Sequence, residues 1–292
     1  MTRLLRTCRK KLGSFVYGCN GRIPWTDGRG YVSYKDSYIE RIIGDEDFLR
    51  GFDAGREIPE DFGMRLDERV IEYPWVLAKL SRYGSRCRFL DAGSTLNHQM
   101  ILEHALARRH KWTLLTLAPE PNCFWDEGVS YVFDDLRSMP FRDRLFDAVF
   151  CISVIEHVGM DNFSYTADGS YREDEPDAYL SAVTEMKRTL SPGGWLYLTV
   201  PFGCYEDHGW LQQFNAPMLS RLIAHFAPQQ VRKVFFRYDD RGWKLSTEDQ
   251  CSNSRYIGKF FRGWDSKQSQ PGPADVASAV AASAVACIEL QK

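Results

Sequence analysis

The chain lacks several features that would assign it to a class at once. None of its eight cysteines form a C-x-x-C pair, it has no apolar run of about 18 residues, and its net charge is only −2 over 292 residues. The missing cysteine pairs argue against a zinc ribbon or a redox motif. The missing run argues against a membrane-spanning helix. The near balance of charge, with no concentrated basic stripe, disfavours nucleic acid as a partner.

The cysteines are scattered, and several fall inside apolar runs, which is typical of reduced thiols in a hydrophobic core. We therefore expect no disulfide framework and no metal site, and a reducing, cytoplasmic location. The cysteines are Cys8, Cys19, Cys87, Cys123, Cys151, Cys204, Cys251 and Cys287.

The N-terminus also lacks the continuous apolar stretch and the small-residue cleavage site of a secretory signal. Residues 1–16 do combine five lysines and arginines with leucines and Phe15. Two interpretations stay open. One is a solvated terminus, and the other is a basic amphipathic helix that lies on an anionic membrane as a peripheral contact.

The 44% hydrophobic content is ample for one large core. Residues 1–72 show no persistent period, which indicates an N-terminal cap of short helices and loops. At 72–84 a helix is expected, with Pro74 in its first turn and Tyr73 extended before it. From there strands and helices alternate to residue 292, which predicts an α/β, Rossmann-like, doubly wound sheet with helices on both faces. The expected strands are 87–93, 112–118, 129–136, 146–158 and 195–203, with a terminal antiparallel pair at 231–239 and 284–292; the expected helices are 97–110 (with Asn97 as N-cap), 177–190 and 216–227.

Ligands of open parallel sheets bind beyond the carboxyl ends of the strands, so the residues there are the most informative. The first strand ends in Asp91 and Gly93, but Thr95 and Asn97 stand where a glycine-rich loop would place further glycines. The second ends in Thr116 where an acidic residue would hold ribose hydroxyls, with Glu120 four residues later. The third ends in Asp134-Asp135, and the fourth delivers Glu156 and His157.

These motifs in this order, D-x-G, then D-x-x-x-x-P-F with an F-D strand start, then E-H-V and L-x-P-G-G-x-L, resemble class I S-adenosylmethionine-dependent methyltransferases of the small-molecule branch. The resemblance covers about residues 86–203. It implies S-adenosyl-L-methionine as cofactor, with Asp91 and Gly93 flanking its methionine part, Asp135 and Leu136 at the adenine, and Ile152 and Ser153 near the sulfonium. The full set of candidate cofactor residues is Asp91, Gly93, Ser94, Thr95, Thr116, Asp135, Leu136 and Ser153.

The acceptor side is predicted from the segment after the fifth strand, where titratable and aromatic residues gather between Tyr205 and Gln213. Carboxylates and a tryptophan suit a sugar hydroxyl or a glycan or lipid precursor, as in polysaccharide biosynthesis. His208 is the first candidate for the base, then His157, with Glu206 or Asp207 as the orienting group. The alternative is a methyltransferase-like module that binds a partner or glycan without catalysis. A nicotinamide dehydrogenase is disfavoured because the glycine fingerprint and the ribose acid are absent.

Overall fold

The structure, a computed structural model, describes residues 28–53, 55–256 and 281–292. Its centre is an eight-stranded sheet in the order β3-β2-β1-β4-β5-β10-β8-β9. The first five strands of that order are parallel, as the alternation of strands and helices predicts. They are β1 (Arg88–Ala92), β2 (Lys111–Thr116), β3 (Ser130–Phe133), β4 (Phe146–Ile152) and β5 (Leu190–Pro201).

The other end of the sheet is antiparallel. β10 (Ala284–Gln291) lies between β5 and β8 (Gln230–Asp239), antiparallel to both, so the expected terminal pair is confirmed. A further strand, β9 (Gly242–Ser246), pairs with β8 at the edge and was not predicted. Its five residues are too few to show a strand pattern in the sequence. Trp243 of this strand is buried, and its indole N–H donates to the carbonyl of Leu66 at 3.0 Å, far away in the sequence.

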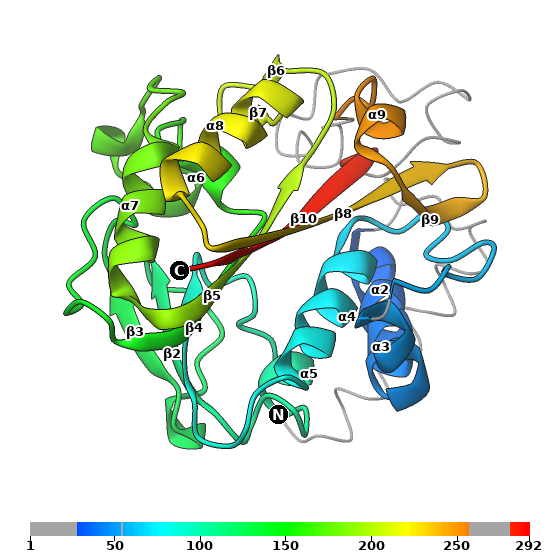
Figure 1. Ribbon diagram of the computed structural model, residues 1–292, viewed down its shortest axis with the longest axis horizontal. Coiled ribbons are helices and arrows are strands. Elements are labelled where there is room, and N and C mark those ends of the chain that lie inside the picture. The colour runs from blue at the N-terminus through cyan, green and yellow to red at the C-terminus, as the bar shows by residue number, and fades with distance from the viewer. Residues whose placement is uncertain (1–27, 54, 257–280) are drawn as a thin grey trace.

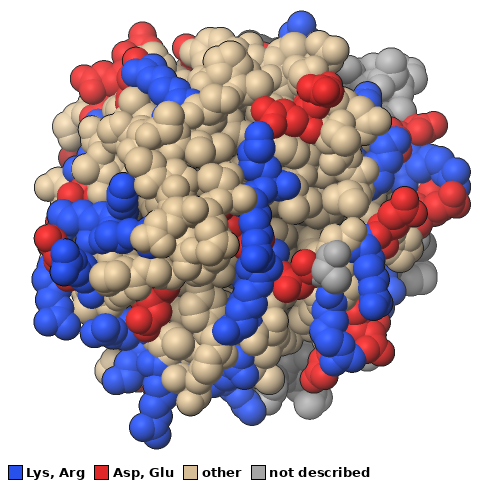
Figure 2. Space-filling model, in the orientation of Figure 1, with Lys and Arg blue, Asp and Glu red and all other residues tan. Residues whose placement is uncertain are grey.

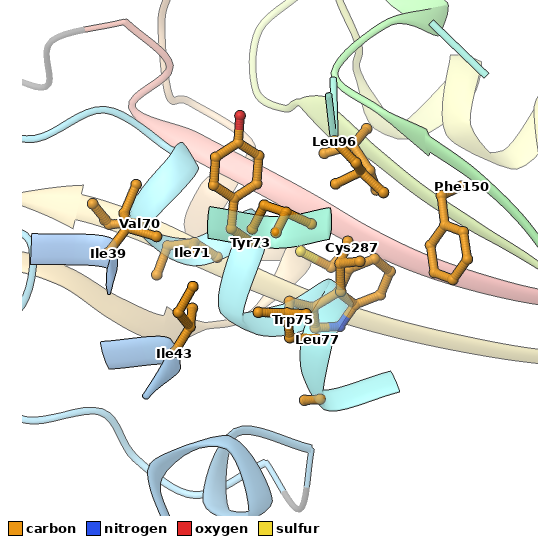
Figure 3. Close-up of a cluster of buried hydrophobic side chains, with 14 of the residues drawn as sticks. Ile39, Ile43, Val70, Ile71, Tyr73, Trp75, Leu77, Leu96, Phe150 and Cys287 are labelled. Carbon is orange, nitrogen blue, oxygen red and sulfur yellow. The ribbon is translucent and has the colours of Figure 1, made fainter. Parts of the chain in front are cut away.

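Helices cover both faces, which confirms the doubly wound architecture. On one face α2 (Gly28–Ile43) and α3 (Glu46–Asp53) pack around α4 (Arg69–Leu80), and on the other lie α7 (Tyr179–Thr189) and α8 (Ala216–Phe226) (Figure 1). Alternate strand residues serve the two faces, with Phe89 and Phe150 in one apolar cluster and Leu90 and Val149 in the other. Figure 3 shows the first cluster, in which side chains of α4 such as Trp75 and Leu77 fill the space between α2 and the sheet.

The helix expected at 97–110 is wrong in length. Only α5 (Gln99–Leu102) forms, and its N-cap residue is His98, not Asn97. The α-helical pattern ends when the N–H of His104 bonds to the carbonyl of Ile101 at 3.1 Å. It does not resume at Leu106, whose N–H bonds to the ring Nδ1 of His104 at 3.2 Å, while the other ring nitrogen of His104 meets the carbonyl of Ile43 at 3.0 Å. A side chain thus replaces the backbone acceptor that a continuing helix needs.

The start of the helix at 72–84 is also corrected. α4 begins at Arg69, so Tyr73 is helical and Pro74 lies inside the helix. Apolar packing sustains the helix around the proline, because Val70, Trp75 and Leu77 are all at most 1% exposed. Tertiary burial therefore outweighs the local cost of an internal proline.

Short elements connect the strands. They are η2 (Trp125–Glu127), η3 (Ile155–His157), α6 (Phe163–Thr166), η4 (Gly169–Tyr171), the two-stranded β6 (Glu206–Asp207) and β7 (Gln212–Gln213), and α9 (Glu248–Cys251). None of the helices in the described ranges is long and apolar enough to cross a membrane. The amphipathic segment predicted at residues 1–16 lies outside the described residues.

On the face shown in Figure 2, basic and acidic side chains are interspersed.

Candidate functional site

A cavity of about 320 Å³ opens at the carboxyl ends of the parallel strands, where the strand order reverses between β1 and β4. That is the position where open α/β sheets bind ligands, and the volume is within the range of small-molecule sites. We name two parts of its lining by their place in the chain. The strand-end wall consists of Gly93, Thr95, 115–120 and 134–137, from the loops after β1, β2 and β3. The outer wall consists of Lys35, 67–69, 156–159, Asn162, Tyr165, Tyr171, Trp210, Leu211, Tyr256 and Ala281.

The turn after β1 requires glycine. Gly93 has φ +114°, and a Cβ atom there would lie 2.3 Å from a methyl carbon of Val154. Its N–H bonds to the carbonyl of Leu115 at 2.7 Å, which holds the loops after β1 and β2 together. Gly93 and Thr95 line the cavity, as the sequence prediction requires.

Asp91 and Ser94 are buried just behind this turn and are not among the lining residues. One carboxyl oxygen of Asp91 accepts from the N–H of Leu96 at 2.8 Å. Its other oxygen and the hydroxyl of Ser94 have no hydrogen-bond partner. Burial raises the pKa of Asp91 to about 8, so this carboxyl keeps its proton at neutral pH in the folded chain.

After β2, Glu120 turns back toward Thr116, with 3.5 Å between the Thr116 hydroxyl and Oε1 of Glu120. Asn97 fixes the other oxygen of Glu120 through its amide nitrogen at 3.0 Å, and the Tyr131 hydroxyl donates to the amide oxygen of Asn97 at 2.9 Å. Asn97 therefore does not cap a helix but holds an acidic side chain against the cavity. Glu120 supplies a carboxylate near the position where Thr116 replaces the usual acid.

After β3, Asp135 and Leu136 line the cavity. Both oxygens of Asp135 accept from the guanidinium of Arg137, at 2.6–3.1 Å, and Arg137 also bonds to Glu173 at 2.8 Å. Against the opposing effect of burial, the hydrogen bonds from Arg137 lower the pKa of Asp135. A ligand group that bonds to Asp135 therefore shares the carboxylate oxygens with Arg137.

After β4, Ser153 lines the cavity in a left-handed conformation with φ +47°. Its N–H bonds to the carbonyl oxygen and to the hydroxyl of Thr199 on β5, at 3.1 and 3.0 Å. The hydroxyls of Ser153 and Thr199 both donate to Oε1 of Glu72 on α4, at 2.7 and 2.6 Å, and the other oxygen of Glu72 pairs with Arg69. A carboxylate with no exposed surface thus fixes the floor of the site to the helix beside it.

Glu156 and His157 both line the cavity, but they come from η3, because β4 ends at Ile152 and not at residue 158 as predicted. The imidazole Nδ1 of His157 lies 2.8 Å from the carbonyl of Trp210, which fixes the proton on Nδ1 because a carbonyl only accepts. Burial lowers the pKa of His157 to about 4, so the ring is neutral at pH 7.

His208 and Glu206 are not among the lining residues. The ring of His208 packs on Tyr256 with centroids 5.3 Å apart, and its Nε2 lies 3.5 Å from Oε2 of Glu206. Glu206 itself binds Arg255 at 2.8 Å and the N–H of Tyr256 at 2.9 Å. The pair therefore supports Tyr256, which does line the cavity. From the predicted segment 205–213, Trp210 and Leu211 line it directly.

Much of the outer wall comes from segments for which the sequence predicted no functional residues. Lys35 and 67–69 precede the predicted nucleotide-binding alternation, and Tyr256 follows β9. No motif marks them, because only long-range folding brings them beside β4.

Carboxyl groups outnumber cations among the lining residues: seven carboxyl side chains (Asp67, Glu68, Glu120, Asp134, Asp135, Glu156, Glu173) stand against three cations (Lys35, Arg69, Arg137).

Within the described ranges, no three His, Cys, Asp or Glu side chains group so as to hold a metal ion.

Residues 102–198 match the family model of the methyltransferase domain. No curated protein matches the chain. Among solved structures, a putative methyltransferase of Bacillus halodurans C-125 is 16% identical with a TM-score of 0.45, over 74% of this chain and 98% of that one. The 1,6-didemethyltoxoflavin-N1-methyltransferase of Burkholderia thailandensis, solved with S-adenosylhomocysteine, is 17% identical with a TM-score of 0.45, over 86% and 87%. The N-methyltransferase NodS of Bradyrhizobium japonicum WM9 is 15% identical with a TM-score of 0.41, over 88% and 97%.

Proposed function

We propose that the chain is a class I S-adenosylmethionine-dependent methyltransferase, since residues 102–198 match the model of the methyltransferase domain. Its cavity would bind that cofactor and serve methyl transfer to a small polar acceptor. The observation that carries the proposal is the cavity itself. It lies at the reversal of strand order, and Gly93, Thr95, Thr116, Asp135, Leu136 and Ser153 of the predicted cofactor set line it.

The lining fits the cofactor. S-adenosylmethionine carries a sulfonium and an ammonium group, and the excess of carboxyl groups over cations in the lining suits such a ligand. Gly93 and Thr95 would hold the methionine part, Glu120 the ribose hydroxyls, and Asp135 with Leu136 the adenine. When bound, the cofactor supplies an electrophilic methyl carbon.

The test is calorimetric titration of the full chain with S-adenosylmethionine and with S-adenosylhomocysteine. We expect saturable binding of both. Absence of heat and of any thermal shift at millimolar concentration would refute the proposal.

One observation favours the alternative of a binding module without catalysis. Both oxygens of Asp135 are already engaged by Arg137, and Thr95 replaces a glycine in the cofactor loop. The same titration distinguishes the two functions, because a module that has lost the cofactor gives no signal with either compound.

The finer prediction, a sugar hydroxyl with His208 as base in polysaccharide biosynthesis, remains a proposal. A hydroxyl acceptor needs a base at the cavity wall. His208 packs behind Tyr256, and the histidine that does line the cavity, His157, has its pKa lowered to about 4. This arrangement favours an acceptor that needs little help from a histidine.

We also keep the cytoplasmic location as a proposal. In the described part of the chain Cys87, Cys123, Cys151, Cys204, Cys251 and Cys287 are free thiols. Thiol counting on denatured, freshly purified protein should find all eight cysteines free, and two or more native disulfides would contradict it.

A further inference from the structure

Two carboxyl groups of the outer wall have no ion-pair partner within the described part of the chain. Glu156 on η3 is 1% exposed, lines the cavity, and its Oε2 atom has no hydrogen-bond partner. Glu68, just before α4, is 7% exposed and lines the same cavity, where its Oε2 accepts from the N–H of Ala282 at 3.3 Å.

The cations of the outer wall are already committed to other carboxylates. Lys35 lies 2.5 Å from Asp67, and Arg69 pairs with Glu72. Burial raises the pKa of Glu68 to about 7, and the charge of Asp67 adds to the increase. Burial likewise raises the pKa of Glu156, with further increases from Glu72 and Glu68. The charge of Arg69, which is paired with Glu72, opposes these increases only in part. Two carboxyl groups thus lie beside the cavity with no cation paired to them, and a cationic ligand would stabilise their charged forms.

Aromatic rings line the same cavity as these carboxyl groups. The rings of Trp210 and Tyr256 lie 6.3 Å apart, His157 lies 5.1 Å from Trp210, and Tyr165 lies 5.7 Å from His157. Burial and the charges of Glu68 and Glu156 together raise the pKa of Tyr256, which lines the cavity with both of them. Carboxylates combined with aromatic faces form a site for an alkylammonium group.

We infer that the acceptor is a small amine, which binds as an ammonium ion between Glu156, Glu68 and the rings of Tyr256 and Trp210. The inference rests on the proposed function and specifies its acceptor. It follows from the unpartnered oxygen of Glu156 in the cavity, from the lack of a free cation in the described outer wall, and from the rings beside them.

The transfer balances with these groups. Glu156 releases its proton to solvent when the ammonium ion binds beside it. The ammonium nitrogen then gives one proton to the carboxylate of Glu156, which frees the nitrogen lone pair. That lone pair forms the new N–C bond while the C–S bond breaks with its electron pair on sulfur, leaving a neutral thioether. A nitrogen lone pair needs no stronger base, whereas a hydroxyl would.

The experiment is calorimetry on the full chain saturated with S-adenosylhomocysteine. Three matched pairs are titrated, benzylamine against benzyl alcohol, n-butylamine against n-butanol, and cyclohexylamine against cyclohexanol. We expect at least one amine to bind about tenfold or more tightly than its alcohol, because a charged hydrogen bond contributes roughly 1.5–3 kcal/mol. In Glu156→Gln that preference should fall to less than about threefold, while binding of S-adenosylhomocysteine is unchanged. The exposed neighbour Glu175→Gln is the matched control and should keep the preference.

Lack of amine preference in all three pairs, including lack of any binding, overturns the inference, as does a preference that Glu156→Gln leaves intact. If Glu156→Gln does not fold, Glu68→Gln takes its place, and the wild-type pairs decide the matter if neither folds. Failure of S-adenosylhomocysteine to bind refutes the proposed function separately. The amine pairs are then titrated into the free chain, where the preference should persist.

Discussion

Replacing Glu72 by alanine should cost the folded chain about 3–5 kcal/mol of unfolding free energy, the usual result of removing one partner of a buried ion pair. The carboxylate has no exposed surface and serves three groups, Arg69 through one oxygen and the hydroxyls of Ser153 and Thr199 through the other. Thr199 is itself fully buried, so in the alanine variant its hydroxyl loses its acceptor and no water can reach it as a replacement. Adding the separate bonds would exceed the measured cost, because they share one carboxylate.

Glu72→Gln provides a graded comparison. The amide keeps an oxygen for the two hydroxyls and loses only the charge beside Arg69, so we expect about 1–3 kcal/mol. Glu57→Ala, at an exposed position, should stay within about 0.5 kcal/mol. The measurement is urea unfolding followed by tryptophan fluorescence. A loss below about 1 kcal/mol for Glu72→Ala would contradict the reasoning. So would an Arg69→Ala, Glu72→Ala double variant whose cost is the sum of the single costs within about 0.5 kcal/mol.

Three further predictions concern the site. Glu120→Gln should weaken cofactor binding by about tenfold in calorimetry through loss of a charged hydrogen bond, with the exposed Glu127→Gln unchanged; equal affinities would remove Glu120 from the ribose site. The pKa of Asp91 is raised from 3.8 to about 8 by burial, so the folded chain holds a proton that the unfolded chain releases, and stability should fall as pH rises between about 4 and 8. In the wild type the melting temperature should drop by roughly 5–10 °C over this pH range. Asp91→Asn should flatten this pH dependence, and an unchanged slope would contradict the raised pKa of Asp91. His208→Ala should lower turnover of the best-binding amine by less than about tenfold, because His208 is not among the lining residues; a loss of a hundredfold or more would restore it as the base.

The sequence predicted the sheet well because each parallel strand is a short apolar run with turn residues after it. β4, for instance, is buried at every residue but Asp147. It also predicted which strand ends supply the strand-end wall, since that rule depends only on strand direction. What it missed depends on single long-range contacts. The helix at 97–110 does not resume after Leu102 because the His104 ring takes the N–H of Leu106, and α4 extends through Pro74 because its side chains are buried.

The outer wall could not be predicted from local pattern. Glu68 and Glu156 are separated by 88 positions in the sequence, and no periodicity connects them. The loop 205–213 was singled out for its chemistry, yet composition could not tell which of its side chains face the cavity. Trp210 lines the cavity, whereas His208 does not and packs on the ring of Tyr256.

The two walls of the cavity come from different stretches of the chain, and this has an evolutionary consequence. The loops after β1, β2 and β3 supply the strand-end wall, while Lys35 and 67–69 enter from α2 and from the approach to α4. Substitutions at Lys35 and 67–69 can therefore change part of the outer wall and leave the strand-end wall as it is, whereas Glu156, Trp210 and Tyr256 reach the same wall from later in the chain. A chimera that exchanges residues 28–68 would therefore change one part of the outer wall and keep Arg69 and Glu72 as a pair.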